Sequence, residues 1–156
     1  VIRKEEAAVV TAQIQKTLDQ GGTLVCGGNR TGAFVAPTVI LTPKTADIAK
    51  DMEVFGPVFP LIPFETEQEA VEIANQTCYG LSSGVMTADM GKAVRTAMQL
   101  QTGACILGGS GNYRLAHQPF GGYKLSGLGR EGAVSTLEEM TQQKTISLKG
   151  ILNGGL

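Results

Sequence analysis

Short apolar runs alternate along this chain with segments in which apolar residues recur at helical spacing. The apolar runs lie at 23–28, 36–43, 57–65, 83–88 and 103–109, and the helical segments at 7–18, 66–77, 89–98 and 133–140. Repeated strand-helix-strand units bring strands side by side and cover them with helices. The alternation therefore predicts an α/β fold with a mainly parallel sheet flanked by helices, and with loops at the strand ends available for chemistry.

Local signals set the ends of the predicted helices. Thr66 and Glu69 form a T-x-x-E capping box, Asp89 can cap the next helix, and Gly21-Gly22 should stop the first one. The faces expected to be buried are Ala7, Val10, Ile14 and Leu18 on the first helix, and Val94, Ala97 and Met98 on the helix after Asp89.

Composition and charge exclude several classes of partner. The 156 residues, 42% hydrophobic and 17% charged, suit one compact soluble body with its own core. A formal net charge of −1 without any basic run argues against nucleic-acid and lipid partners. The most apolar stretch, 34–43, is interrupted by Pro37 and Pro43, so we expect no membrane-spanning segment.

The cysteines and the single histidine indicate neither a disulfide nor a metal site. Cys26, Cys78 and Cys105 are far apart and form no C-x-x-C, which is typical of a cytoplasmic protein. We expect all three to be small core residues, since none stands beside a base or at a helix N-terminus. His117 is expected to be structural or exposed. The opening VIRKEEAAVV, without an initiating Met, is expected to be the start of an excised piece.

The segment GLGREG at 127–132 matches the G-x-G-x-x-G spelling of a dinucleotide-binding loop. A working loop needs a buried strand before it and an acidic residue about 20 positions later, and neither is present. Glu131 would also place a carboxylate where the phosphates should lie. We therefore predict a tight loop entering a helix, with Glu131 as an acid of its first turn. Independent dinucleotide binding through this loop stays a minor alternative.

Three motifs in order resemble the NAD(P)-dependent aldehyde dehydrogenases. These are EVFGPV at 53–58, EAVEIANQTCYGLSSGV at 69–85 and QPFGGYKLSGLGREG at 118–132, and residues 21–40 are similar to a further segment of the family. In QPFGGYKLSGLGREG, the glycines let the backbone take positive φ and pass close to another surface.

The resemblance implies that this chain is the second half of a catalytic domain plus an oligomerisation strand. Residues 1–139 would belong to the catalytic domain and 140–156 to the strand and tail, with the strand at 143–152 lacking a partner in this chain. The nucleophilic cysteine, the general-base glutamate and the oxyanion-binding asparagine of the family would lie upstream. No catalytic residue is therefore expected here, and the isolated chain should be inactive.

A cofactor-binding role follows for two residues of EVFGPV. The resemblance implies that Glu53 accepts hydrogen bonds from the nicotinamide ribose of NAD or NADP, and that Phe55 packs near the nicotinamide. A carboxylate can accept two hydroxyl hydrogen bonds and so aim the ring for hydride transfer.

The loop before Pro119 would line the inner mouth of the substrate tunnel, at Tyr113, Arg114 and Leu115. An arginine there would favour an acidic aldehyde such as a semialdehyde. The alternative is that Arg114 tethers the loop to a neighbouring acid or carbonyl. Gly108 stands where the family commonly has asparagine, so the loop geometry should differ.

The parent protein is then expected to oxidise an aldehyde to an acid through a cysteine thioester, with NAD or NADP accepting the hydride. We expect a homo-oligomer, a dimer or a tetramer, because an edge strand without a partner favours association. The alternative is a non-catalytic assembly module, in which the glycine loops and the final strand only pair subunits.

Overall fold

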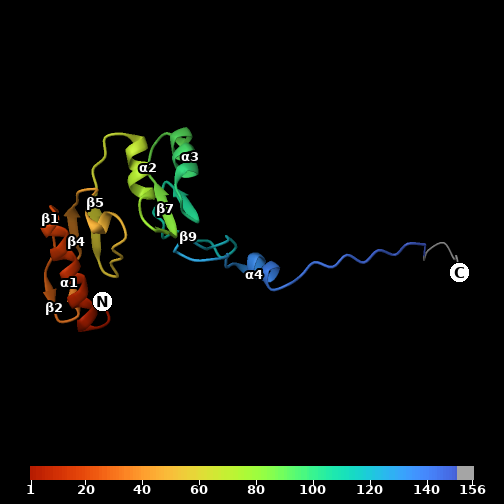
Figure 1. Ribbon diagram of the computed structural model, residues 1–156, viewed down its shortest axis with the longest axis horizontal. Helices are drawn as coiled ribbons and strands as arrows, with labels where there is room; N and C mark the ends of the chain where they lie inside the picture. Colours follow the sequence, from red (N-terminus) through yellow and green to blue (C-terminus); the bar gives the residue numbers. More distant parts are fainter. Residues whose placement is uncertain (151–156) are drawn as a thin grey trace.

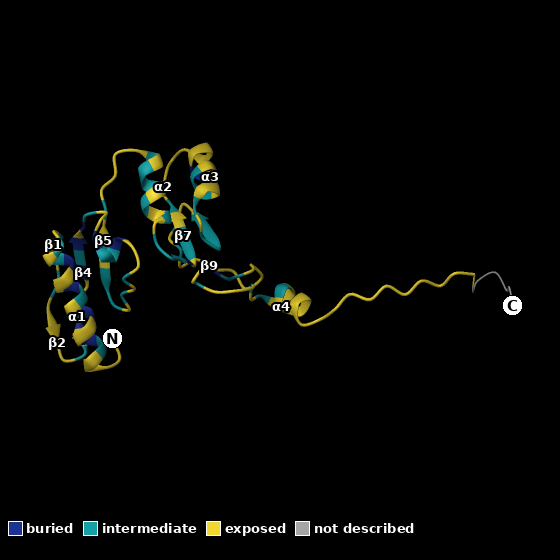
Figure 2. Ribbon diagram, in the orientation of Figure 1, coloured by how far each residue is buried: buried dark blue, intermediate teal, exposed yellow. Residues whose placement is uncertain are grey.

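The chain forms two lobes and an extended C-terminal segment (Figure 1). The computed structural model describes residues 1–150. The first lobe runs from α1 (Lys4–Asp19) to β5 (Val58–Leu61), and the second begins with α2 (Glu67–Asn75). Beyond it, α4 (Ala133–Glu139) leads into an exposed segment that runs away from both lobes (Figure 2).

The first lobe packs α1 beside a three-stranded sheet with the order β1-β4-β5 (Figure 1). β1 (Thr23–Cys26) pairs antiparallel with the central β4 (Thr38–Leu41), and β5 pairs parallel with it. A two-stranded hairpin of β2 (Arg30–Thr31) and β3 (Phe34–Val35) stands between β1 and β4 in sequence, and the 3-10 helix η1 (Asp47–Ala49) follows β4.

The hydrophobic core of this lobe forms where the predicted face of α1 meets the sheet. Ala7, Val10 and Ile14 are buried as predicted, and they cluster with Val35 and Ile40. Leu18 is half-buried against the same cluster. Figure 2 shows that the deeply buried positions gather in α1 and β4. Gly21 ends the helix with a positive φ of 95°, a conformation that glycine adopts at little cost.

The second lobe contains a strand-helix-strand unit. β7 (Ser82–Val85) and β8 (Ala104–Leu107) pair in parallel, and α3 (Met90–Gln99) connects them. α2 lies beside α3 (Figure 1). A second, antiparallel pair joins β6 (Tyr79–Gly80) to β9 (Tyr123–Lys124), so the glycine-rich segment returns to the strand that follows α2.

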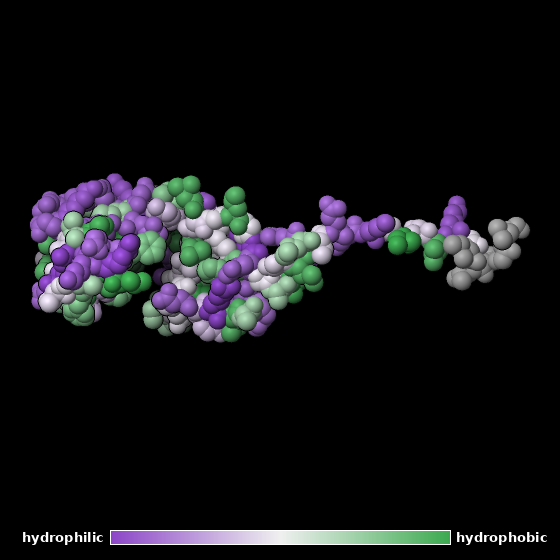
Figure 3. All heavy atoms as spheres, turned by 90° about the horizontal axis from the view of Figure 1, so that it is seen from below, coloured by the Kyte–Doolittle hydropathy of each residue, from purple (hydrophilic) through white to green (hydrophobic). Residues whose placement is uncertain are grey.

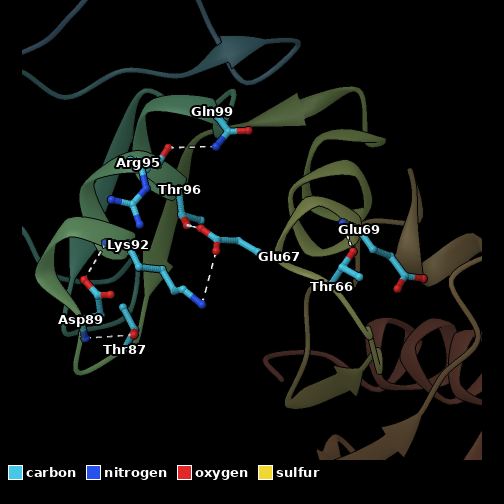
Figure 4. Close-up of polar contacts among 9 residues, drawn as sticks. All are labelled: Thr66, Glu67, Glu69, Thr87, Asp89, Lys92, Arg95, Thr96 and Gln99. Atoms are coloured by element: carbon cyan, nitrogen blue, oxygen red, sulfur yellow. Dashed lines mark hydrogen bonds and ion pairs between the residues drawn. The ribbon is translucent and has the colours of Figure 1, made fainter.

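Both predicted helix caps are confirmed (Figure 4). The Thr66 hydroxyl accepts a hydrogen bond from the Glu69 amide at 3.1 Å, and the Asp89 carboxylate accepts one from the Lys92 amide at 2.9 Å. The Glu69 carboxylate accepts from the Glu65 amide at 2.9 Å, so the box closes one residue before its usual position. These caps fix where α2 and α3 begin.

A polar contact joins the two capped helices (Figure 4). The Glu67 carboxylate accepts from the Thr96 hydroxyl at 2.7 Å and faces the Lys92 ammonium at 3.4 Å. These partners lower the pKa of Glu67, with the Thr96 hydroxyl as the larger cause. The carboxylate therefore stays ionised and holds α2 against α3 over the neutral pH range.

The mixed α/β class is confirmed, but the expected single, mainly parallel sheet needs correction. Residues 1–150 form four small sheets, in which only β4–β5 and β7–β8 are parallel. A parallel pair needs a long crossover, and segments 42–57 and 86–103 provide the two that occur. The shorter link from β2 to β3 returns the chain antiparallel.

The predicted buried face of α3 is wrong. Val94 is 43% exposed and Met98 is 83% exposed, whereas Ala93 is buried. Ala97 is half-buried. The helix contacts β7, β8 and α2, and the contact between Thr96 and Glu67 turns its small residues inward.

Two predicted strands differ from expectation in their surroundings. The apolar run at 23–28 is typical of a buried strand, but β1 is exposed throughout because it pairs only with β4 and has an open edge. The predicted final strand at 143–152 is extended and exposed over 143–150, and these residues pair with no other strand of the described chain. Its last residues, and the tail to residue 156, lie outside the described residues.

Ile40 should be a main source of stability in the first lobe. It is fully buried, so Ile40→Ala should lower the free energy of unfolding by about 2–5 kcal/mol through lost burial and the cavity left behind. Urea unfolding followed by circular dichroism measures the loss. Leu41→Ala is the matched control: its side chain, next along β4, is 45% exposed, and its effect should be under about 1 kcal/mol. Equal losses would contradict this assignment of the core.

Candidate functional site

The loop that carries Glu53 and Phe55 is fixed closely against α1. At Gly56, an added Cβ would lie 2.8 Å from a methyl carbon of Val10, so only glycine lets the loop approach this helix without displacement. Val54 packs against the same core cluster. The Gln13 side-chain amide donates to the Glu53 carbonyl at 3.0 Å. The main chain at Glu53 is therefore held in place on the α1 side.

The two predicted cofactor residues point away from this anchored backbone. Glu53 is exposed, and Phe55 is 78% exposed. An exposed aromatic ring next to an exposed carboxylate, on a backbone held by buried neighbours, is an arrangement suited to binding rather than to core packing. Both side chains are available to a ligand in the described chain.

Asp51 and Tyr79 lie next to this loop and extend the cluster. The Asp51 carboxylate accepts from the Cys78 amide at 2.7 Å, and this bond is the main cause that lowers the pKa of Asp51. The thiolate form of Cys78, as the largest cause, and the Glu53 carboxylate raise the pKa of the Tyr79 phenol. At neutral pH the site therefore combines an ionised Asp51 with a protonated tyrosine that can donate a hydrogen bond.

Tyr113 and Arg114 line a cavity in the second lobe. Its volume is about 280 Å³, and the lining residues are Ser82, Ala104, Cys105, Ile106, Tyr113, Arg114, Gln118, Pro119 and Phe120. Leu115 is not among the lining residues and is 37% exposed. The cavity is thus formed by β8, by Ser82 at the start of β7 and by the segment that follows β8. The structure brings together two of the three predicted substrate residues, and it keeps them on a different lobe from Glu53.

Arg114 already has partners within the chain. Its guanidinium forms an ion pair with the Glu131 carboxylate at 2.6 Å and lies over the Phe120 ring, 4.2 Å from the centroid. Both side chains of the ion pair are partly exposed, so the pair alone adds little stability. These are the contacts expected if Arg114 tethers the loop, which was the alternative to substrate binding.

The glycine-rich segment folds back on itself. Phe120 and Glu131 exchange two backbone hydrogen bonds, at 2.8 and 2.7 Å. Gly127 and Gly129 take positive φ, as predicted, whereas Gly121 and Gly122 do not. A Cβ at Gly121 would meet the Gly129 carbonyl and the Arg130 side chain. Glu131 precedes α4 and so is not an acid of its first turn as predicted, because it is used in this bridge.

The predicted core role of the three cysteines is wrong, since none of them is among the buried core residues of the described chain. Cys26 is exposed on β1, since that strand has an open edge, whereas Cys78 and Cys105 are half-buried. The Asp51 carboxylate, which accepts a hydrogen bond from Cys78, raises the pKa of the Cys78 thiol, so little of this thiol is ionised at neutral pH.

Within residues 1–150, no cluster of three or more His, Cys, Asp and Glu side chains is placed to bind a metal ion. None of the helices described is long and apolar enough to span a membrane.

Sequence reasoning missed Asp51, Gln13 and Tyr79. Asp51 and Gln13 reach the site through contacts between residues far apart in the sequence, and Tyr79 through its electrostatic coupling to Glu53. A single sequence offers no pattern that reports such contacts. Gly56 was visible within EVFGPV, but its packing on Val10 was not.

Comparison with known proteins assigns the fold and sequence to a family. The model of the Aldehyde dehydrogenase family matches residues 1–146. A lactaldehyde dehydrogenase of Methanococcus maripaludis is 40% identical over 151 residues, which are 97% of this chain and 32% of that protein.

Two solved structures are similar to this chain. A glyceraldehyde-3-phosphate dehydrogenase, GapN, of Methanocaldococcus jannaschii complexed with NADP has a TM-score of 0.88 and 40% identity, covering 94% of this chain and 32% of that chain. Aldehyde dehydrogenase 21 from Physcomitrella patens, in complex with the reaction product succinate, has a TM-score of 0.84 and 39% identity, covering 90% of this chain and 29% of that chain.

This mixed α/β chain belongs to the aldehyde dehydrogenase family. It spans 32% of the length of the lactaldehyde dehydrogenase that it matches.

The raised pKa of Cys78 should be visible in its reactivity. At pH 8, iodoacetamide should alkylate the exposed Cys26 faster than Cys78, because a raised pKa leaves less thiolate at a given pH. Asp51→Ala removes the main cause of that shift and should speed up alkylation of Cys78 without changing the rate at Cys26. Peptide mass spectrometry over a time course gives both rates. A Cys78 rate that is unchanged in the variant would contradict the assignment.

Proposed function

We propose that this chain is the C-terminal part of an NAD(P)-dependent aldehyde dehydrogenase. Residues 1–139 would be the second half of its catalytic domain, and 140–156 its oligomerisation strand and tail. The observation that supports this best is the family match over residues 1–146, together with the order of the three motifs. The parent enzyme would oxidise an aldehyde to the acid through a thioester on a cysteine that is not among these residues.

Glu53 and Phe55 would hold the nicotinamide half of the cofactor. NAD or NADP, when bound, supplies the hydride acceptor. The Glu53 carboxylate would accept hydrogen bonds from two ribose hydroxyls, while Phe55 would present its ring beside the nicotinamide. The donor set fits this role, since Glu53 is exposed and its main chain is fixed by Gln13. The NADP complex of the similar GapN structure is consistent with such a cofactor.

Tyr113, Arg114 and Leu115 would line the inner mouth of the substrate tunnel. Two similar enzymes support an anionic substrate, because one is named for glyceraldehyde 3-phosphate and the other was solved with succinate. An acidic semialdehyde would place its carboxylate at the guanidinium of Arg114. That carboxylate would have to share Arg114 with Glu131 or displace it.

The parent enzyme would assemble as a homo-oligomer in the cytoplasm. Large apolar side chains are exposed along α4 and beyond it, at Val134, Leu137, Met140, Ile146 and Leu148. Figure 3 shows apolar side chains at the surface around α4 and again on the extended segment. Exposed apolar surface of this kind marks an association surface. The three free cysteines are consistent with a reducing compartment. A non-catalytic assembly module would use the same surfaces but would not need Glu53.

Glu53 should be decisive for cofactor use in the full-length protein. Glu53→Ala removes both ribose hydrogen bonds and should lower kcat/KM for the cofactor by about 10- to 100-fold, as expected for two charge-assisted bonds. Glu53→Gln keeps one acceptor oxygen and should lose less. Initial rates of NADH or NADPH formation measure the effect, and Glu65→Ala, which removes an exposed acid elsewhere, is the control. Wild-type kinetics in Glu53→Ala would reject the cofactor role.

Arg114 should set the preference for acidic aldehydes. In Arg114→Ala, the ratio of kcat/KM for succinic semialdehyde to that for a neutral aldehyde of similar length should fall about tenfold or more. Glu131→Gln separates the two roles: it removes the ion pair but keeps the arginine, so the ratio should hold or rise. If both variants lower the melting temperature and leave the ratio unchanged, Arg114 is only a tether.

A further inference from the structure

The turn that follows α2 makes hydrogen bonds to three separate parts of the chain. On the first-lobe side, the Gln76 side-chain amide donates to the Ala49 carbonyl at 2.7 Å, and the Cys78 amide donates to the Asp51 carboxylate at 2.7 Å. The Thr77 hydroxyl donates to the same carboxylate oxygen at 3.3 Å. The turn at 75–78 is thus bonded to the segment that leads into Glu53.

Further bonds of this turn reach the second lobe. The Lys124 ammonium donates to the carbonyls of Asn75 and Thr77, both at 2.8 Å, and the Leu125 amide donates to the Cys78 carbonyl at 3.0 Å. The Asn75 side chain bonds the Gln99 carbonyl and the Gln101 amide, both at 2.8 Å. The turn is therefore hydrogen-bonded to three segments, 49–51, 99–101 and 124–125, and these bonds restrict its movement.

Asp51 is the side chain that joins the Glu53 loop to this support. It precedes Glu53 by two residues, and Gln13 fixes the loop from the opposite direction through the Glu53 carbonyl. With both anchors present, the main chain around Glu53 is bonded to α1 on one side and to the α2 turn on the other. Without Asp51, the α1 anchors would remain, but the 51–53 segment would lose its connection to the turn.

We propose that Asp51 is a positioning residue for cofactor binding. Its carboxylate accepts hydrogen bonds from the Cys78 amide and the Thr77 hydroxyl, and these bonds fix the Glu53 loop to the turn at 75–78. The inference rests on the proposed role of Glu53. Asp51 touches no cofactor atom in this scheme. It reduces the freedom of the loop before binding, so its loss is expressed as weaker cofactor binding and not as slower chemistry.

Full-length enzyme with Asp51→Ala tests the inference. The cofactor KM, and the dissociation constant from NADH or NADPH fluorescence titration, should rise about five- to tenfold, while kcat at saturating cofactor should change by less than about twofold. Asp51→Asn keeps an acceptor oxygen in the same place and should restore values to within about twofold of wild type.

Two further variants keep the outcome decisive. Asp51→Glu retains the charge but moves the carboxylate by one methylene, so it should also weaken cofactor binding, and it decides the matter if Asp51→Ala does not fold. Asp89→Ala removes a carboxylate that accepts a hydrogen bond from a backbone amide of α3, away from the Glu53 loop. This variant should lower the melting temperature without changing cofactor affinity.

The results separate this inference from the proposed function. Wild-type cofactor affinity in Asp51→Ala and Asp51→Glu, with weak affinity in Glu53→Ala, overturns only the positioning role. Weak affinity in Asp89→Ala as well would attribute the effect to general destabilisation and also overturn it. Wild-type affinity in Glu53→Ala overturns both proposals.

Discussion

The main-chain groups at the C-terminal end of α2 connect the two lobes of the described chain. A helix leaves its last carbonyls without partners inside the helix, and here the Asn75 and Thr77 carbonyls are bonded by the Lys124 ammonium. The neighbouring Cys78 amide is bonded by Asp51. One turn therefore satisfies its polar groups with side chains from both lobes. Lys124 takes a φ of 54°, an unusual conformation for a residue with a side chain, at the position where it makes these bonds.

Glycine permits the close approaches on which this arrangement depends. A Cβ at Gly80 would collide with the Gln101 carbonyl, and one at Gly103 would collide with the Gly121 carbonyl. The strand after α2, the start of β8 and the glycine-rich segment can therefore lie side by side only because these positions lack side chains. The glycines of QPFGGYKLSGLGREG thus serve packing within the chain, in addition to any contact with a ligand.

The sequence predicted what depends on neighbours in the chain and failed where distant contacts decide. The caps at Thr66 and Asp89 and the stripe Ala7, Val10 and Ile14 follow from spacing alone, so they were predicted correctly. The buried face of α3 was wrong because the hydrogen bond from Thr96 to Glu67 comes from another helix, which residue hydrophobicity does not encode. The cofactor role of Glu53 follows only from a resemblance and stays a prediction. Asp51 was missed, because its partners follow α2 and nothing in its own surroundings marks it.

The proposed chemistry requires two groups that this chain carries on different lobes. Glu53 lies before β5 in the first lobe, and the loop of Tyr113 and Arg114 follows β8 in the second. Hydride transfer tolerates little error in the distance between aldehyde and nicotinamide, so the geometry between these lobes matters as much as either site. The turn at 75–78 is bonded both to the Glu53 segment and to the strands and loops of the second lobe. Its hydrogen bonds are partly exposed and add only modest stability to the fold. Their larger effect is on the placement of the Glu53 loop, because a loop that is fixed before binding loses less freedom when the cofactor binds.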